Sequence, residues 1–160
     1  MRRRLRRFVY AGAGRAVTLL PTVVAAKNAF ALLGGMLLCG ETRGLEERHG
    51  MRRATEERAA IVATVLNRVR QRRSTPEREI LRRGQYVPSV ACGVPQLRRL
   101  NALFWTYYRN PGQIPTWARK AYAFATPKAA RFVRKQWIAG GFVEVPQAVS
   151  ETAHVFFTKP

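Results

Sequence analysis

The side chains that could carry acid–base chemistry in this chain are all glutamates. The nine acidic residues stand at positions 41, 46, 47, 56, 57, 77, 79, 144 and 151, and aspartate is absent. Mechanisms that need an Asp nucleophile, an Asp metal ligand or a Ser-His-Asp triad are therefore excluded. Glu41 directly follows the apolar run 29–40 (AFALLGGMLLCG), whose apolar side chains could desolvate a carboxyl and raise its pKa. Arg43 acts in the opposite direction, and distance decides which effect prevails.

The remaining groups with reactive side chains do not form a recognisable metal site. Cys39 and Cys92 are 53 positions apart, and only His49 and His154 could join them, whereas structural zinc needs clustered ligand pairs. We therefore expect no metal and no cofactor. Two buried free thiols are favoured, and a disulfide is the alternative.

The elements that must position Glu41 are mostly helical. Residues 29–39 predict a buried helix that Gly40 ends, and residues 42–54 predict a charged loop in which Glu46 and Glu47 are solvated. Thr55 is a predicted N-cap for a helix that runs to about Arg73, with an apolar face at helical spacing.

The second half of the chain predicts shorter elements. Helices are expected over 78–83, 97–108, 116–125 and from Thr126-Pro127 to Gly140-Gly141. The runs 142–145 and 153–158 are rich in β-forming residues and are expected to pair. The fold class is therefore α+β, mainly α, with a small β element.

Composition fits one folded domain with an unusual charge. The chain has 160 residues and a formal net charge of +20, which attracts polyanions such as nucleic acid, anionic lipid or peptidoglycan. We divide it into a basic arm with an apolar lead-in (1–28) and a domain (29–160). A basic segment followed by short apolar runs is also the pattern of a signal peptide, but neither run reaches the ~20 apolar residues of a transmembrane helix. An uncleaved arm is favoured.

Three segments, in order, resemble the catalytic domain of the SleB-type cell-wall hydrolases, the spore-cortex-lytic enzyme family that also occurs in phages. Residues 37–44 (LLCGETRG) are similar to the family's apolar helix that ends in Glu-Ala-Arg-Gly, with Thr42 in place of Ala. Residues 61–69 (IVATVLNRV) resemble its helix ending in Leu-Asn-Arg-Val, and residues 84–86 (GQY) resemble its Gln-Phe. A weaker match is 152–157 (TAHVFF), where the family has a terminal strand with a histidine.

The resemblance implies a lysozyme-like fold and a lytic transglycosylase that cleaves the MurNAc-GlcNAc β-1,4 bond. Glu41 would be the single catalytic acid and then base, because the C6 hydroxyl of N-acetylmuramic acid acts as the nucleophile. The expected substrate-binding residues are Arg43, Asn67, Gln85, Tyr86 and His154. Each of these residues except Arg43 has an alternative, purely structural role. Asn67 could make ordinary hydrogen bonds, and Gln85 and Tyr86 could form a turn with Tyr86 in the core. His154 could be a strand histidine with an internal hydrogen-bond partner.

The implied partner is peptidoglycan, together with anionic outer-membrane or wall polymers and other virion proteins. The implied place of action is the bacterial cell wall or periplasm, for a phage endolysin or a virion-associated protein. The alternative function is a basic nucleic-acid-binding protein or a structural virion protein without catalysis. Arginine clusters at 2–7, 52–53, 68–73 and 82–83 could pair with phosphates.

Overall fold

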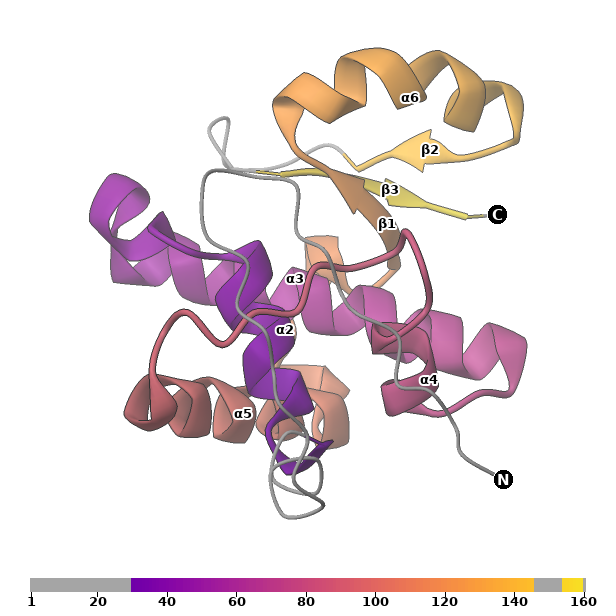
Figure 1. Ribbon diagram of the computed structural model, residues 1–160. Helices are drawn as coiled ribbons and strands as arrows, with labels where there is room; N and C mark the ends of the chain where they lie inside the picture. The colour runs from indigo at the N-terminus through magenta and orange to yellow at the C-terminus, as the bar shows by residue number, and fades with distance from the viewer. Residues whose placement is uncertain (1–29, 146–153, 160) are drawn as a thin grey trace, which may run out of the picture.

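The computed structural model describes residues 30–145 and 154–159, and the basic arm expected over 1–28 lies outside them. The described part is mainly helical, with a small three-stranded sheet (Figure 1). In chain order the elements are α2 (Leu33–Glu41), α3 (Leu45–Arg72), α4 (Pro76–Ile80), α5 (Val94–Arg109), η1 (Pro111–Gln113), η2 (Thr116–Ala118), β1 (Ala121–Ala125), α6 (Pro127–Ala139), β2 (Val143–Glu144) and β3 (Val155–Thr158).

The sheet lies between α6 on one side and the helical body on the other (Figure 1). Its strand order is β1-β3-β2, and both pairings are antiparallel, with Phe124 opposite Phe156 and Glu144 opposite Phe157. Helix α3 packs against β1, so the longest helix carries the sheet. Strand β3 is the central strand of the sheet. His154, the residue just before β3, is therefore buried in the interior of the protein.

Helix α2 is the centre of the hydrophobic core. Its run from Leu33 to Cys39 is buried, as expected for a helix that is apolar on all sides. Helix α5 lies against it and buries Leu97, Leu100 and Phe104. The Asn101 side chain joins the two helices, because its Oδ1 accepts a hydrogen bond from the Gly35 N–H at 3.1 Å.

The prediction of a loop over 42–54 is wrong. Helix α2 continues through Gly40 to Glu41, and α3 begins at Leu45 rather than after Thr55. Gly44, in the left-handed conformation, is the N-cap of the helix, and the non-helical Gly50 (φ 80°) puts a kink inside it. The end near Arg73 is confirmed.

The predicted helix over 116–125 is also wrong. Only Thr116–Ala118 forms a short 3-10 turn, and Ala121–Ala125 is the strand β1. Its alternating Ala-Tyr-Ala-Phe-Ala pattern pairs with β3, and this pairing prevails over the helix preference of alanine. The Thr126 N-cap of α6 and the pairing of 142–145 with the last strand are confirmed, although residue 153 lies outside the described range.

Over the residues that the structure describes, none of the helices has both the length and the apolar character needed to cross a membrane.

Cys39 and Cys92 form a disulfide, which corrects the expectation of free thiols. The segment between Tyr86 and Cys92 runs along α2, and the Ser89 N–H donates to the Met36 carbonyl at 2.8 Å. This brings the two Cα atoms to 6.0 Å, within the usual range for a disulfide. The sequence alone could not reveal that this irregular segment lies beside the buried helix.

Reduction of the disulfide is expected to lower the free energy of unfolding by about 2–4 kcal/mol, because the bond closes a long loop of the unfolded chain. The measurement is denaturant unfolding with and without a thiol reductant. The Cys39→Ala/Cys92→Ala variant is the control, and reductant should not destabilise it further. An unchanged midpoint for the reduced wild type would contradict the disulfide.

Candidate functional site

Glu41 is the last residue of α2, and its carboxyl group is almost fully removed from solvent. Its side chain is 10% exposed, and Oε1 accepts a hydrogen bond from the Val87 N–H at 2.7 Å. Burial raises the pKa of Glu41 above its usual range, against the lowering effects of the Val87 N–H and of His154. The negative end of the α2 dipole also disfavours a carboxylate there. Glu41 therefore holds its proton to a higher pH than a solvated glutamate does.

Arg43 does not have the influence on Glu41 that its place in the sequence predicts. Its side chain is exposed, and the groups that oppose the raised pKa of Glu41 are Val87 and His154. The Arg43 carbonyl instead accepts a hydrogen bond from the Arg48 side chain at 3.0 Å. A contact between Arg43 and a substrate stays a prediction.

The turn after Glu41 is fastened to α3 by buried polar contacts. The Thr42 hydroxyl donates to the Leu38 carbonyl and accepts from Arg58 Nε at 3.1 Å. Arg58 also forms an ion pair with Glu46, so the prediction that Glu46 is a solvated loop charge is wrong. Because Thr42 is buried and fully engaged, the position next to Glu41 has little freedom.

The segment that supplies the Val87 N–H approaches α2 so closely that only glycine fits at position 40. A Cβ at Gly40 would lie 1.6 Å from the Val87 carbonyl oxygen. The close approach aligns residues 87–89 with the end of α2. Glycine at position 40 is therefore what allows the backbone to reach the Glu41 carboxyl.

His154 stands between Glu41 and a second buried glutamate. His154 Nδ1 lies 2.6 Å from Glu57 Oε1, and its Nε2 lies 4.0 Å from Glu41 Oε2. Glu57 and His154 are 1% and 4% exposed. A carboxylate can only accept hydrogen bonds, so Nδ1–H donates to Glu57 and the Nε2 side of the ring faces Glu41. Phe124 packs edge-on against the imidazole, with centroids 4.9 Å apart.

Glu57, Phe124 and the backbone of Val87 also belong to the site, and the sequence did not predict them. Glu57 was expected in the first turn of a helix, where negative charge is unremarkable, and Phe124 was placed in a helix instead of a strand. A signal for Glu57 does exist, since it precedes Ile61 by four positions and therefore lies on the same face of α3.

Three buried polar residues of α3, which we call the α3 polar stripe, hold the other segments of the site. They are Glu57, Thr64 and Arg68, at positions i, i+7 and i+11 on one face of the helix. Glu57 binds His154, and Thr64 Oγ1 lies 2.9 Å from the Tyr86 hydroxyl. The stripe therefore connects segments that are far apart in the sequence.

Arg68 completes the stripe by joining the Gln85–Tyr86 turn to the sheet. It donates to Gln85 Oε1, and its Nε donates to the Tyr122 carbonyl at 2.8 Å. The guanidinium also lies 5.1 Å from the centroid of the Tyr86 ring. Burial raises the pKa of Tyr86 to about 12, so this hydroxyl remains protonated at any physiological pH.

The expected substrate-binding residues have different surroundings in the structure. Tyr86 and His154 lie with Glu41, but both are buried and have internal partners, as does the partly buried Gln85. The Asn67 amide donates to the carbonyls of Arg119 and Ala121, which fixes the start of β1. These residues build the site; their contacts with a substrate stay predictions.

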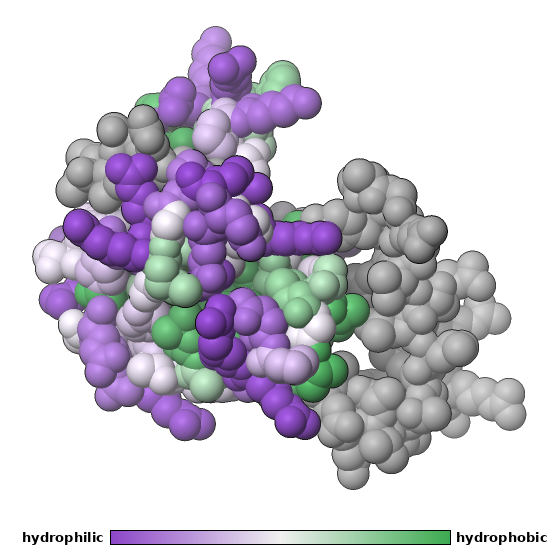
Figure 2. Space-filling view, turned by 90° about the vertical axis from the view of Figure 1, so that its left-hand side faces the viewer, coloured by the Kyte–Doolittle hydropathy of each residue, from purple (hydrophilic) through white to green (hydrophobic). Residues whose placement is uncertain are grey.

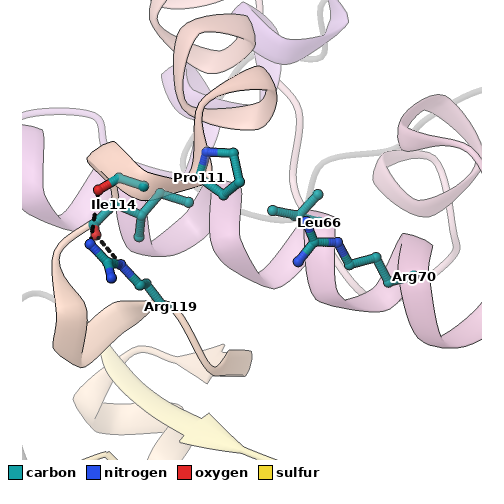
Figure 3. Close-up of a pocket in the computed structure, with 6 residues that line it drawn as sticks. Leu66, Arg70, Pro111, Ile114 and Arg119 are labelled. Atoms are coloured by element: carbon teal, nitrogen blue, oxygen red, sulfur yellow. Dashed lines mark hydrogen bonds between the residues drawn. The ribbon is translucent and has the colours of Figure 1, made fainter.

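Two hollows on the surface are lined by residues other than Glu41. The first, about 240 Å³, lies between α3 and the loop before β1 (Figure 3). In it, Leu66 and Arg70 come from α3, and Arg119 is held by the carbonyls of Ile114 and Gly112. The second, about 330 Å³, is lined by α3 and α5. Glu41 lines neither, so a sugar-binding trench beside it stays a prediction.

Among the residues that the structure describes, no cluster of three or more His, Cys, Asp or Glu side chains could hold a metal ion.

Comparisons of the chain with protein-family models, with curated proteins and with solved structures give no match.

Substitution of Gly40 by alanine is expected to lower the free energy of unfolding by about 1–3 kcal/mol, because the new Cβ forces the Val87 backbone away from α2. The measurement is denaturant unfolding monitored by circular dichroism. Gly112→Ala is the matched control, because a Cβ there would meet nothing within 4 Å. Equal effects of the two substitutions would refute the close approach.

The raised pKa of Glu41 predicts a pH-dependent effect of Glu41→Gln on stability. The folded protein binds this proton more tightly than the unfolded chain, so ionisation of Glu41 costs stability as pH rises above the unfolded value of 4.5. The amide side chain of the variant does not ionise and removes that cost. The variant should melt at a higher temperature than wild type at pH 8, and the difference should shrink as the pH falls towards 4.5.

Glu47→Gln, which alters an exposed glutamate in the first turn of α3, is the control for this experiment. A difference between wild type and Glu41→Gln that stays constant between pH 4.5 and 8 would mean that Glu41 ionises as a solvated residue.

Proposed function

We propose that this chain is a lytic transglycosylase that cleaves the MurNAc-GlcNAc β-1,4 bond of bacterial peptidoglycan, with Glu41 as its only catalytic carboxyl. The fold would be a SleB-like, lysozyme-like domain. The observation that carries the proposal is the buried, backbone-held carboxyl of Glu41 with its raised pKa, next to His154. Glu41, Tyr86 and His154 come from three of the segments on which the family resemblance rests.

The two oxygens of Glu41 have different surroundings, which suggests how they would act. Oε1 accepts the Val87 N–H, so the proton belongs on Oε2. Oε2 would protonate the glycosidic oxygen as the C1–O bond breaks. The C6 hydroxyl of the MurNAc residue then attacks C1 and gives its proton to the Glu41 carboxylate, which restores the acid. The products are a 1,6-anhydro-MurNAc end and a GlcNAc 4-hydroxyl.

His154 would influence the pKa of the catalytic acid, Glu41, from inside the protein. The electrostatic effect of His154 lowers the pKa of Glu41 and so opposes the larger effect of burial. Glu57 fixes the imidazole at 2.6 Å and so keeps Nε2 directed at Glu41. We assign His154 and Glu57 as positioning residues in this mechanism, with no direct contact to the sugar.

The position of Glu57 favours a transglycosylase over a two-carboxylate hydrolase. A hydrolase needs a second carboxylate on the opposite side of the scissile bond, to act as nucleophile or to activate water. Glu57 is 1% exposed, and His154 lies between it and Glu41. It cannot take that place without a rearrangement of the core.

Purified peptidoglycan incubated with wild type, Glu41→Gln and Glu47→Gln tests the proposal. We expect 1,6-anhydro-muropeptides from wild type and Glu47→Gln, and a rate at least ~100-fold lower for Glu41→Gln, because general acid–base catalysis contributes about 10²–10⁴-fold. Mass spectrometry of the soluble products is the measurement. Glu41→Gln keeps a carbonyl oxygen that can accept the Val87 N–H.

Other outcomes of this digestion contradict the proposal. Reducing ends would indicate a hydrolase, and equal product from Glu41→Gln would remove Glu41 from the mechanism. If no variant releases product, the protein is a structural or nucleic-acid-binding component instead.

A further inference from the structure

Helix α6 has an outer face that is not used by the fold. Its covered side carries Ala130, which is buried, and Val133 and Trp137, which are half-buried, and Trp137 packs on the sheet. The opposite side of the helix is exposed. The residues on that side form what we call the α6 outer face: Lys128, Arg131, Phe132, Lys135 and Ile138.

The outer face combines positive charge with large apolar side chains. At 100° per residue, Lys128, Arg131 and Lys135 lie within about 60° of one another around the helix axis, with Phe132 on one flank and Ile138 on the other. Phe132 is 78% exposed and Ile138 is 51% exposed. Figure 2 keeps α6 at the top of the molecule and shows hydrophilic side chains projecting there beside hydrophobic ones.

The three cations of the outer face are available to an external anion. Helix α6 contains no acidic residue, and Arg134, on its inner edge, is already bound to both carboxylate oxygens of Glu144. In the part of the chain that the structure describes, no ion pair involves Lys128, Arg131 or Lys135. Their charge is therefore not neutralised within the fold.

We propose that the α6 outer face docks this protein on an anionic phospholipid surface. The cations would lie at the level of the lipid phosphates, and Phe132 and Ile138 would enter the boundary between headgroups and acyl chains. The long Lys and Arg side chains can turn their charged ends back to the phosphates, while Phe132 and Ile138 lie deeper on the two flanks of the face. A phosphate backbone alone would leave both apolar side chains in water, so nucleic acid is the less suitable occupant.

The proposal does not depend on glycan cleavage. It would hold the domain at a bilayer by an element on the side of the sheet away from α2, so Glu41 takes no part in the contact. All binding measurements can therefore use the Glu41→Gln background, and failure of either proposal leaves the other standing.

The test is co-sedimentation of the full chain with large unilamellar vesicles of phosphatidylglycerol and phosphatidylcholine, against vesicles of phosphatidylcholine alone. Lys128→Gln/Arg131→Gln/Lys135→Gln should lose on the order of 100-fold in affinity for the anionic vesicles, at about fivefold per charge near the surface. The control removes three exposed cations elsewhere: Arg83→Gln/Arg98→Gln/Lys120→Gln. It should stay within a few-fold of the parent.

A second pair of variants tests the apolar part of the face. Phe132→Ser/Ile138→Ser should lose about 10-fold, because membrane binding scales with buried apolar area. Met51→Ser/Val94→Ser, whose parent side chains are 54% and 53% exposed, should lose nothing. Circular dichroism verifies that all variants are folded.

Three results would overturn the proposal. Equal losses for the two charge triples would mean that the whole +20 chain binds without a docking face. Equal binding to both kinds of vesicle would exclude anionic lipid as the partner. The third result is tight binding of a DNA duplex without any binding to vesicles. If that DNA binding depends on Lys128, Arg131 and Lys135 but not on Phe132 and Ile138, the face binds nucleic acid.

Discussion

The site depends on the polar stripe of α3, a set of three hydrogen-bonding side chains inside an otherwise apolar helix face. Buried polar groups are costly unless each finds a partner, so Glu57, Thr64 and Arg68 each determine where another segment must lie. Each binds one of three distant segments: the residue before β3, the turn after α4, and β1. The same contacts that satisfy the stripe therefore bring His154 and the backbone of Val87 to the end of α2.

The pKa of Glu41 is set by effects of its surroundings that act in opposite directions. Burial removes water from the carboxyl and favours its neutral form, while one backbone N–H and one imidazole favour the charged form. If burial acted alone, Glu41 would be a poor base, and if the polar contacts acted alone, it would be a poor acid. A residue that must give a proton and then take one back needs both, and this balance is what makes Glu41 suited to the proposed reaction.

Sequence reasoning could predict the elements that are encoded locally. The apolar helix before Glu41, the end of α3 near Arg73 and the Thr126 cap of α6 follow from periodicity and capping chemistry. The helix start at Leu45 was missed because it depends on the left-handed conformation of Gly44, which composition does not reveal. The strand β1 could not be predicted, because its pairing with the distant β3 decides it. The role of Glu57 was missed for the same reason, because its partner His154 is 97 positions away.

The Cys39–Cys92 bond lies two residues before Glu41 and five after Val87, so it links covalently the same two segments that the hydrogen bond between Val87 and Glu41 joins. Disulfides persist in oxidising compartments and are kept reduced in a bacterial cytosol. In a reducing compartment, residues 87–92 would be held against α2 only by non-covalent contacts such as the hydrogen bond from the Ser89 N–H to the Met36 carbonyl. The environment of the chain therefore decides whether the segment that supplies the Val87 N–H is held by a covalent bond or by weak contacts alone.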